Sequence, residues 1–245
     1  MIDPAHLDIT SDPPRPAAST AIGQMLVSSR SLAEYRAMFA LTENDLRQRI
    51  LDCPGGASSF TAEVAAAGGD AIACDPIYAT ATPSELACLA LADVDRGNTY
   101  VRGHPEEYVW TFFADPDAHR TTRRAAAGMF AAHLATGVDR YVPAALPELP
   151  FDDRAFNLVL CSHLLFSYAD RLDLDFHHRA ITELVRVSRS EVRVYPLVAV
   201  GDGTAYPRLQ QLLHNLGRDG IRAHTTEVSY EFQRGARHML VCTRS

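Results

Sequence analysis

The chain has 245 residues, of which 47% are hydrophobic and 22% are charged, and its formal net charge is −7 at pH 7. This length and balance predict one compact domain, and no apolar run approaches the roughly 18 residues that a membrane helix needs. The acidic charge, without a long basic run, argues against nucleic acid as a partner. All 23 basic residues are arginine. Mechanisms that need a Schiff-base lysine, a P-loop lysine or a Tyr-x-x-x-Lys pair are therefore excluded.

Residues 1–20 are rich in proline and serine, and they lack the basic start and apolar core of a secretory signal. We therefore expect a disordered arm over 1–20, a single domain over 21–245, and a cytoplasmic protein. The five cysteines include no C-x-x-C pair. An odd number of cysteines in a chain without a signal argues against a disulfide framework.

Secondary-structure patterns then follow in order. Residues 30–47 begin with helical apolar spacing, and "LTEND" predicts a stop followed by a new helix cap. The expected strands are 49–53, 70–75, 140–146, 156–162, 191–197, 221–232 and 237–244, and the expected helices between them are 57–68, 83–93, 174–188 and 206–220. This alternation predicts an α/β fold with a doubly wound, mostly parallel seven-stranded sheet. The last two strands are joined by too few residues for a crossover, so an antiparallel C-terminal hairpin is expected.

Residues 96–135 interrupt the alternation and hold much of the aromatic content. We expect a helical insertion that lies over the carboxyl edge of the sheet. Its Tyr108, Trp110 and Phe113 are candidates for substrate contact, and the alternative is that these rings pack the insertion against the body. The arginine cluster at 120–124 is expected on a solvated helix face.

The stretch "ILDCPGGASSF", residues 50–60, predicts a strand, a glycine turn and a helix start. Such a turn presents backbone N–H groups, and Gly55 and Gly56 let a ligand approach the backbone closely. Asp75 ends the second strand, 23 residues after Asp52. A carboxylate there suits a cis-diol, because it can accept two hydroxyl hydrogen bonds. Together these features predict an adenosine-type ligand on the first two strands.

The sequence resembles class I S-adenosylmethionine-dependent methyltransferases in three motifs. They are the stretches "ILDCPGGASSF", "ACDPIY" and "LPELPFDDRAFNLVLCSHLLF". The resemblance covers roughly residues 48–243, with 96–135 as an insertion. It implies a Rossmann-like methyltransferase fold, S-adenosyl-L-methionine as the cofactor, and methyl transfer as the activity. The glycine motif departs from the family pattern, because Pro54 replaces its first glycine and Ser58 its third.

The resemblance also implies roles by position. Asp52 would lie near the cofactor's amino group, Asp75 would hold the ribose hydroxyls, and residues 145–146 would surround the purine. Residues 161–163 would border the transferable methyl group, and Arg30 and Tyr35 would cap the methionine end. The expected cofactor-binding residues are Arg30, Tyr35, Asp52, Pro54, Gly55, Gly56, Asp75, Pro76, Ala145, Leu146, Cys161 and Ser162.

Methyl transfer from a sulfonium is an in-line displacement, so the protein mainly aligns the acceptor and removes its proton where needed. His163 follows the fourth strand and is the candidate base. The expected substrate-binding residues are Tyr108, Trp110, Phe113, Tyr168 and Tyr230. The polar cluster at 168–178 lacks the acidic pattern of metal-dependent methyltransferases, so no metal is expected, and Asp173 or Asp175 is expected to cap the next helix.

The sequence thus favours methyl transfer to an O, N or C atom of a small molecule. Neither a membrane nor nucleic acid is expected as a partner. Two alternatives stay open. One is a non-catalytic binding module or partner subunit with the same fold, which the altered glycine motif supports. The other is an NAD(P)-dependent oxidoreductase, which could use the same glycines and Asp75.

Overall fold

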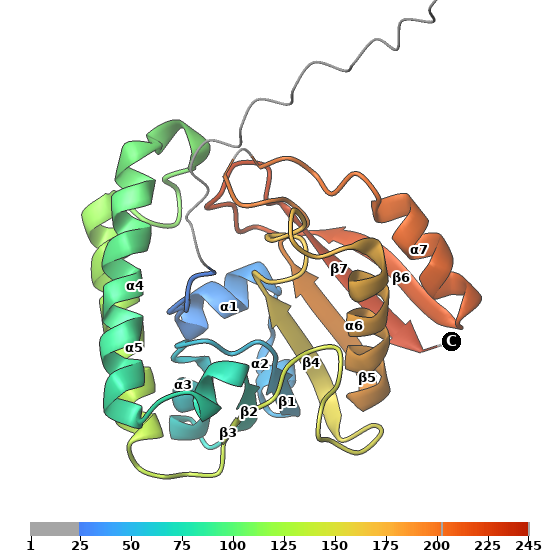
Figure 1. The fold of residues 1–245 in the computed structure, drawn as a ribbon, viewed down its shortest axis with the longest axis horizontal. Helices are drawn as coiled ribbons and strands as arrows, with labels where there is room; N and C mark the ends of the chain where they lie inside the picture. The colour runs from blue at the N-terminus through green and yellow to red at the C-terminus, as the bar shows by residue number, and fades with distance from the viewer. Residues whose placement is uncertain (1–24, 202, 245) are drawn as a thin grey trace, which may run out of the picture.

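The computed structural model describes residues 25–201 and 203–244 (Figure 1), so the arm predicted over 1–20 lies outside the described residues. The described part forms seven strands: β1 (Arg49–Asp52), β2 (Asp70–Cys74), β3 (Tyr141–Val142), β4 (Phe156–Ser162), β5 (Ser188–Tyr195), β6 (Ile221–Glu227) and β7 (His238–Arg244). Its helices are α1 (Leu32–Met38), α2 (Glu43–Leu46), α3 (Phe60–Ala66), α4 (Pro83–Gly103), α5 (Pro116–Leu134), α6 (Leu174–Val187) and α7 (Leu209–Arg218), with short 3-10 turns η1 (Pro76–Ala79) and η2 (Pro105–Glu107).

The strands form one sheet in the order β3-β2-β1-β4-β5-β7-β6. Neighbours from β3 to β5 pair in parallel, whereas β7 runs antiparallel to both β5 and β6. The predicted doubly wound sheet and its antiparallel C-terminal hairpin are therefore confirmed. This is the fold that the resemblance to class I methyltransferases implies. Its switch point lies between β1 and β4, where the chain turns from one half of the sheet to the other.

Three strand boundaries differ from the prediction by three residues or more. β3 pairs with β2 only through Tyr141 and Val142, because Pro143 has no N–H with which to continue the ladder. β5 begins at Ser188, directly after α6, three residues before the predicted start at 191. β6 ends at Glu227 rather than at 232, because the chain leaves the sheet to form a loop beside the insertion.

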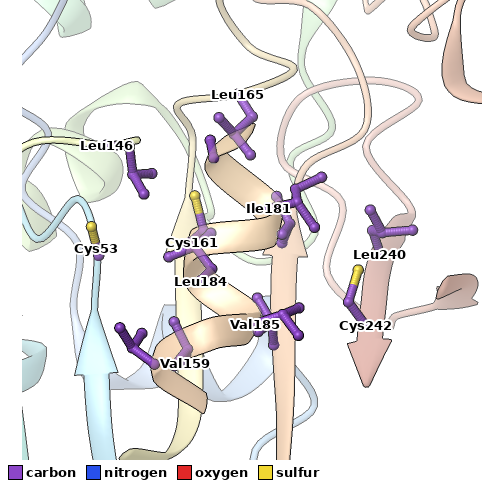
Figure 2. Close-up of a cluster of buried hydrophobic side chains, with 14 of the residues drawn as sticks. Cys53, Leu146, Val159, Cys161, Leu165, Ile181, Leu184, Val185, Leu240 and Cys242 are labelled. Atoms are coloured by element: carbon purple, nitrogen blue, oxygen red, sulfur yellow. The ribbon is translucent and has the colours of Figure 1, made fainter. Parts of the chain in front are cut away.

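Helices cover both faces of the sheet. Alternate strand residues face opposite sides, so Leu51 and Val159 pack with α6 and α7 while Ile50 and Leu160 pack with α1 and α3. Figure 2 shows α6 lying across β4 and β5 in the first of these two layers, where its apolar side chains meet Val159 and Cys161. The sheet is thus supported by a packed core on each of its two faces.

The insertion is helical, as predicted, but its boundary at 96 is wrong. Helix α4 runs without a break from Pro83 to Gly103, and it starts where Thr82 and Glu85 form a reciprocal capping box. Helix α5 starts after Asp115, whose carboxylate accepts the N–H of Ala118. The two helices stand side by side at the β3 end of the sheet (Figure 1). Among the described helices, none is long and apolar enough to cross a membrane.

Candidate functional site

Two cavities lie at the carboxyl edge of the sheet. The first, which we call the turn cavity, has a volume of about 330 Å³ and is lined by the segments that follow β1, β2, β3 and β4. Residues 25–28 cross above it, and α6 borders it. Of the predicted cofactor-binding residues, Pro54, Gly56, Asp75, Pro76, Ala145, Leu146 and Ser162 line this cavity. A cavity at the carboxyl ends of parallel strands, beside the switch point, is where this fold class binds its ligands.

The backbone N–H groups of the glycine turn are engaged within the protein. The Gly55 N–H donates to Cys74 O (3.0 Å), and the Ala57 N–H donates to Ser28 O (3.1 Å). The Gly56 N–H donates to the Asp75 carboxylate (3.0 Å). The expectation that the turn presents these three N–H groups to a ligand is therefore wrong, because the end of β2 and the segment 25–31 fold against the turn.

The two glycines are needed for that packing. A Cβ on Gly55 would lie 2.7 Å from the Tyr78 hydroxyl and 2.8 Å from the Ala73 Cβ. Gly56 has a φ of +52°, a left-handed conformation that favours glycine, and a Cβ there would lie 3.0 Å from Ser28 O. Gly56 lines the turn cavity, whereas Gly55 lies outside its lining and packs against β2.

Asp75 holds the turn and faces the cavity. Its two carboxylate oxygens accept the N–H groups of Gly56 and Ile77, each at 3.0 Å, and its residue exposure is 7%. Burial raises the pKa of this carboxyl, and the two N–H groups oppose that rise. Each carboxylate oxygen has two lone-pair sites, so Asp75 keeps the capacity to accept further hydrogen bonds from a ligand.

Asp52 lies deeper than predicted. The Tyr35 hydroxyl contacts both of its carboxylate oxygens, at 2.9 and 3.0 Å, and both residues are buried. Burial raises the pKa of Asp52 well above its usual range, an effect that the Tyr35 hydrogen bond reduces. Tyr35, Asp52 and Cys161 belong to the core beneath the site, outside the lining of both cavities.

The second cavity, which we call the arginine cavity, has a volume of about 120 Å³. It lies between residues 26–30, helices α4 and α5, the loops that follow β4 and β5, and the loop between β6 and β7. The predicted residues that line it are Arg30, Tyr108, His163, Tyr168 and Tyr230. Arg30 was expected at the methionine end of a cofactor, but it lies in this cavity and not in the lining of the turn cavity.

Trp110 and Phe113 do not line the arginine cavity, so their predicted role in substrate contact lacks structural support. Phe113 is buried, with its ring 5.1 Å from Phe232 and 4.9 Å from His119. Trp110 packs against the other side of this group, 5.5 Å from the Phe232 ring. Both rings join the insertion to the body, which was the alternative interpretation.

A buried ion network forms the back of the arginine cavity. Glu34, fully buried in α1, pairs with the Arg123 guanidinium at 2.7 and 2.8 Å and with that of Arg30 at 3.3 Å. The Tyr230 hydroxyl also donates to Glu34, at 3.0 Å, and the Arg123 Nε donates to the His119 Nε2 at 3.1 Å. Burial lowers the pKa of His119 to about 2, helped by the two arginines, so its ring is neutral.

His163 and Tyr168 line both cavities, together with residues 26–28. His163 has a φ of +50°, its N–H donates to Tyr195 O (2.7 Å), and its Nδ1 lies 2.8 Å from the Ser162 hydroxyl. Burial, followed by the charges of Arg30 and Arg123, lowers the pKa of His163 well below its usual range. A neutral imidazole therefore stands at the junction of the two cavities.

The polar cluster at 168–178 caps a helix, as predicted. Asp173 accepts the N–H of Phe176 (2.7 Å) at the start of α6, whereas Asp175 pairs with Arg179 on the surface (2.9 Å). No group of three or more His, Cys, Asp or Glu side chains placed to hold a metal ion occurs within residues 25–201 and 203–244.

Comparison with known proteins identifies a curated relative. The chain is 30% identical to the uncharacterized protein MJ0045 of Methanocaldococcus jannaschii over 217 residues, which span 88% of this chain and 94% of the relative. The chain belongs to the family of that protein. It matches no protein-family model.

Solved structures with a similar fold are S-adenosylmethionine-dependent methyltransferases. Magnesium protoporphyrin IX methyltransferase of Synechocystis PCC 6803 with bound SAM is 13% identical, with a TM-score of 0.47 over 87% of this chain and 78% of that one. A putative methyltransferase of Methanococcus maripaludis is 11% identical, with a TM-score of 0.45 over 87% and 83% of the two chains.

The sequence analysis missed Glu34, His119 and Arg123. Arg123 belongs to the cluster at 120–124 that was expected on a solvated helix face, and its residue exposure is only 6%, whereas Arg120 and Arg124 are exposed and pair with Asp95. The spacing held a usable signal. The buried positions of α5 are His119, Arg123, Ala126, Ala127 and Phe130, so the helical period places Arg123 on the apolar face.

Proposed function

We propose that this protein is an S-adenosylmethionine-dependent methyltransferase that acts on a small molecule, at an O, N or C atom. The observation that carries the proposal is the junction of the two cavities at His163 and Tyr168. One cavity opens on the strand ends that an adenosyl ligand would use, and the other opens beside it toward aromatic side chains. A donor and an acceptor could thus meet in a space bordered by the fourth strand.

The turn cavity fits the adenosyl part of the cofactor through side chains more than through backbone N–H groups. Asp75 offers the remaining acceptor sites of its carboxylate to the two ribose hydroxyls. Ala145 and Leu146 offer apolar and backbone contacts to the purine, as the resemblance implies. Gly56 leaves room at the cavity wall. Its left-handed φ suits glycine, and a residue with a side chain would be strained there.

The bound cofactor would supply an activated methyl group, so the chain's own residues need to align the acceptor and manage its proton. If His163 Nδ1–H donates to the Ser162 hydroxyl, the ring's Nε2 is left as an acceptor. The low pKa makes this ring a weak base, so it suits an acceptor whose proton leaves easily. Residues 26–28, which border both cavities, would restrict water at the junction.

Calorimetric titration of the full chain with S-adenosylmethionine, S-adenosylhomocysteine and NADH, in separate runs, tests the cofactor. Micromolar binding of the two adenosyl-sulfur ligands without binding of NADH is expected. Binding of NADH alone would indicate an NAD-dependent dehydrogenase and contradict the proposal.

A binding module without catalysis is the second candidate, and one observation favours it. The three N–H groups of the glycine turn are already engaged, so the cofactor would be held by fewer backbone donors than the turn could offer. Tight binding of S-adenosylhomocysteine together with no methyl transfer to any acceptor in a broad small-molecule screen would support this second function.

A further inference from the structure

The arginine cavity has an excess of positive charge. Among the residues that the structure describes, Arg30 and Arg123 face a single carboxylate, that of Glu34. This carboxylate already accepts hydrogen bonds from both arginines, from Tyr230 and from the Ser31 N–H. Asp93 also lines the cavity, but its charge is paired with Arg96 at 2.8 Å and it accepts the Val27 N–H. One positive charge therefore remains in a largely buried space.

The unsatisfied polar atoms around this cavity can all donate hydrogen bonds. Arg30 Nε, Ser29 Oγ and His119 Nδ1 are buried and have no hydrogen-bond partner in the described part of the chain. His119 Nε2 accepts from Arg123, so in the neutral ring Nδ1 carries the proton. Buried donors in native proteins normally have an acceptor. A ligand that satisfies these donors would therefore accept several hydrogen bonds and carry negative charge.

The remaining walls suit a small apolar body. Tyr108, Tyr195 and Phe232 are buried aromatic residues of the lining, and Val94 and Val101 of α4 face them. The volume of about 120 Å³ is small. Pockets for drug-sized ligands are typically about 300–1,000 Å³. A single ring with one anionic substituent agrees with both the size and the walls.

We propose that the arginine cavity binds the methyl acceptor and that this acceptor is a small aromatic carboxylate, with its carboxylate against Arg30 and Arg123 and its opposite end toward His163. This inference rests on the proposed methyl transfer for the word acceptor, but the carboxylate preference can be tested without it. A planar guanidinium binds a carboxylate through two parallel hydrogen bonds, which accounts for arginine at both positions.

The cofactor's own amino-acid end is the competing ligand for these arginines. That end carries an ammonium as well as a carboxylate. The nearby carboxylate of Glu34 already forms ion pairs with both arginines. An ammonium placed beside Arg30 and Arg123 would therefore be repelled by their positive charges. An anion without a cationic group fits the cavity better.

The test compares matched pairs of probes on the full chain. Binding of benzoate and 4-hydroxybenzoate is measured by calorimetry against benzamide and 4-hydroxybenzamide, which have nearly the same shape without the charge. We expect each carboxylate to bind at least about tenfold more tightly than its amide, because hydrogen bonds to charged groups are the stronger class. Equal affinities within each pair would overturn the proposal.

Two variants and a control locate the effect. Arg30→Gln is the main variant, because Arg30 makes one contact to Glu34 at 3.3 Å and its loss leaves the Glu34–Arg123 pair in place. Arg123→Gln is the second, used if circular dichroism shows that it folds. Arg120→Gln is the matched control on the same helix, since Arg120 is exposed and pairs with Asp95. The carboxylate preference should fall to near unity in Arg30→Gln and persist in Arg120→Gln.

Titration of the same variants with S-adenosylhomocysteine separates the two proposals. An Arg30→Gln variant that loses affinity for S-adenosylhomocysteine while its carboxylate preference is unchanged would assign the arginines to the cofactor and overturn the acceptor assignment. A wild-type chain that prefers carboxylates but binds no adenosyl-sulfur ligand would retain the anion site and refute the proposed methyl transfer.

Discussion

The two cavities share one edge of the sheet, but they satisfy their polar groups in opposite ways. In the turn cavity, donors and acceptors pair with each other: Gly56 and Ile77 donate to Asp75, and Gly55 donates to Cys74 O. In the arginine cavity, donors outnumber acceptors. Within the described part of the chain, three buried donor atoms there have no hydrogen-bond partner. The first is held in shape by the protein's own hydrogen bonds, whereas the second keeps buried donors available to an anion.

The construction of the two cavities differs as well. The turn cavity is lined chiefly by the segments that directly follow four parallel strands. The arginine cavity is lined by residues 26–30, α4, α5 and loops that include the one before β7, and the ion pair behind it joins Glu34 of α1 to Arg123 across 89 residues of sequence. Removing a group should therefore change the folding stability most in the arginine cavity and ligand affinity most in the turn cavity.

The largest effect on stability is expected for Glu34→Ala. This change leaves the Arg123 guanidinium buried beside Arg30 without a carboxylate, and losing one partner of a buried ion pair destabilises a protein by about 3–5 kcal/mol. Urea unfolding followed by circular dichroism measures the loss. Glu43→Ala is the control, because Glu43 pairs with Arg36 on the surface, and it should change stability little. Similar results for the two variants would show that the buried network does not distinguish this cavity.

The packing of the glycine turn against β2, beside the turn cavity, can be tested with Gly55→Ala. The added Cβ would meet the Tyr78 hydroxyl at 2.7 Å and the Ala73 Cβ at 2.8 Å, so overpacking should cost about 1–3 kcal/mol of unfolding free energy. Gly128→Ala in α5 meets nothing within 4 Å and should stabilise by about 0.5–1 kcal/mol through helix propensity. A neutral Gly55→Ala would mean that β2 and the turn can separate, which contradicts a preformed cavity.

Ligand affinity in the turn cavity should depend on Asp75. Asp75→Asn keeps an oxygen to accept one backbone N–H but removes the charge, and we expect it to weaken binding of S-adenosylhomocysteine by about 1–3 kcal/mol. Asp70→Asn, at the exposed opposite end of β2, is the control. Unchanged calorimetric affinity in a folded Asp75→Asn chain would remove Asp75 from the ribose site.

A pH dependence of stability is also expected to arise in the arginine cavity. The folded chain holds His119 neutral, with a pKa of about 2, whereas the unfolded chain binds a proton there below pH 6.5. This contribution to stability is complete above pH 6.5 and is lost as the pH falls below it, by about 1.4 kcal/mol per pH unit. Unfolding of His119→Gln between pH 7 and 4 should therefore show a shallower slope than the wild type.

Two results would bear on that prediction. His224→Gln, a change of an exposed histidine on β6, should leave the slope as it is in the wild type. An unchanged slope for His119→Gln would mean that the ring is protonated in the folded chain, which would alter the charge count of the arginine cavity.

The sequence by itself determined the sheet and much of the turn cavity. Strand runs such as 71–74 and 158–161 are continuous and apolar because helices cover both faces of the sheet, and the short link before β7 allows only an antiparallel partner. Pro54, Gly56 and Asp75 could be located because residues at the ends of parallel strands meet at one edge. These are local patterns, which one chain segment reveals without its neighbours.

Only the tertiary structure decided the arginine cavity and the state of the glycine turn. The helical period places Arg123 on the apolar face of α5, but its partner Glu34 comes from α1, and only the packing of the two helices buries the pair together. The turn's N–H groups look free until the segment 25–31 and β2 supply acceptors. The hydrogen-bond and ion-pair partners of these groups come from segments far apart in sequence, so a local sequence pattern does not identify them.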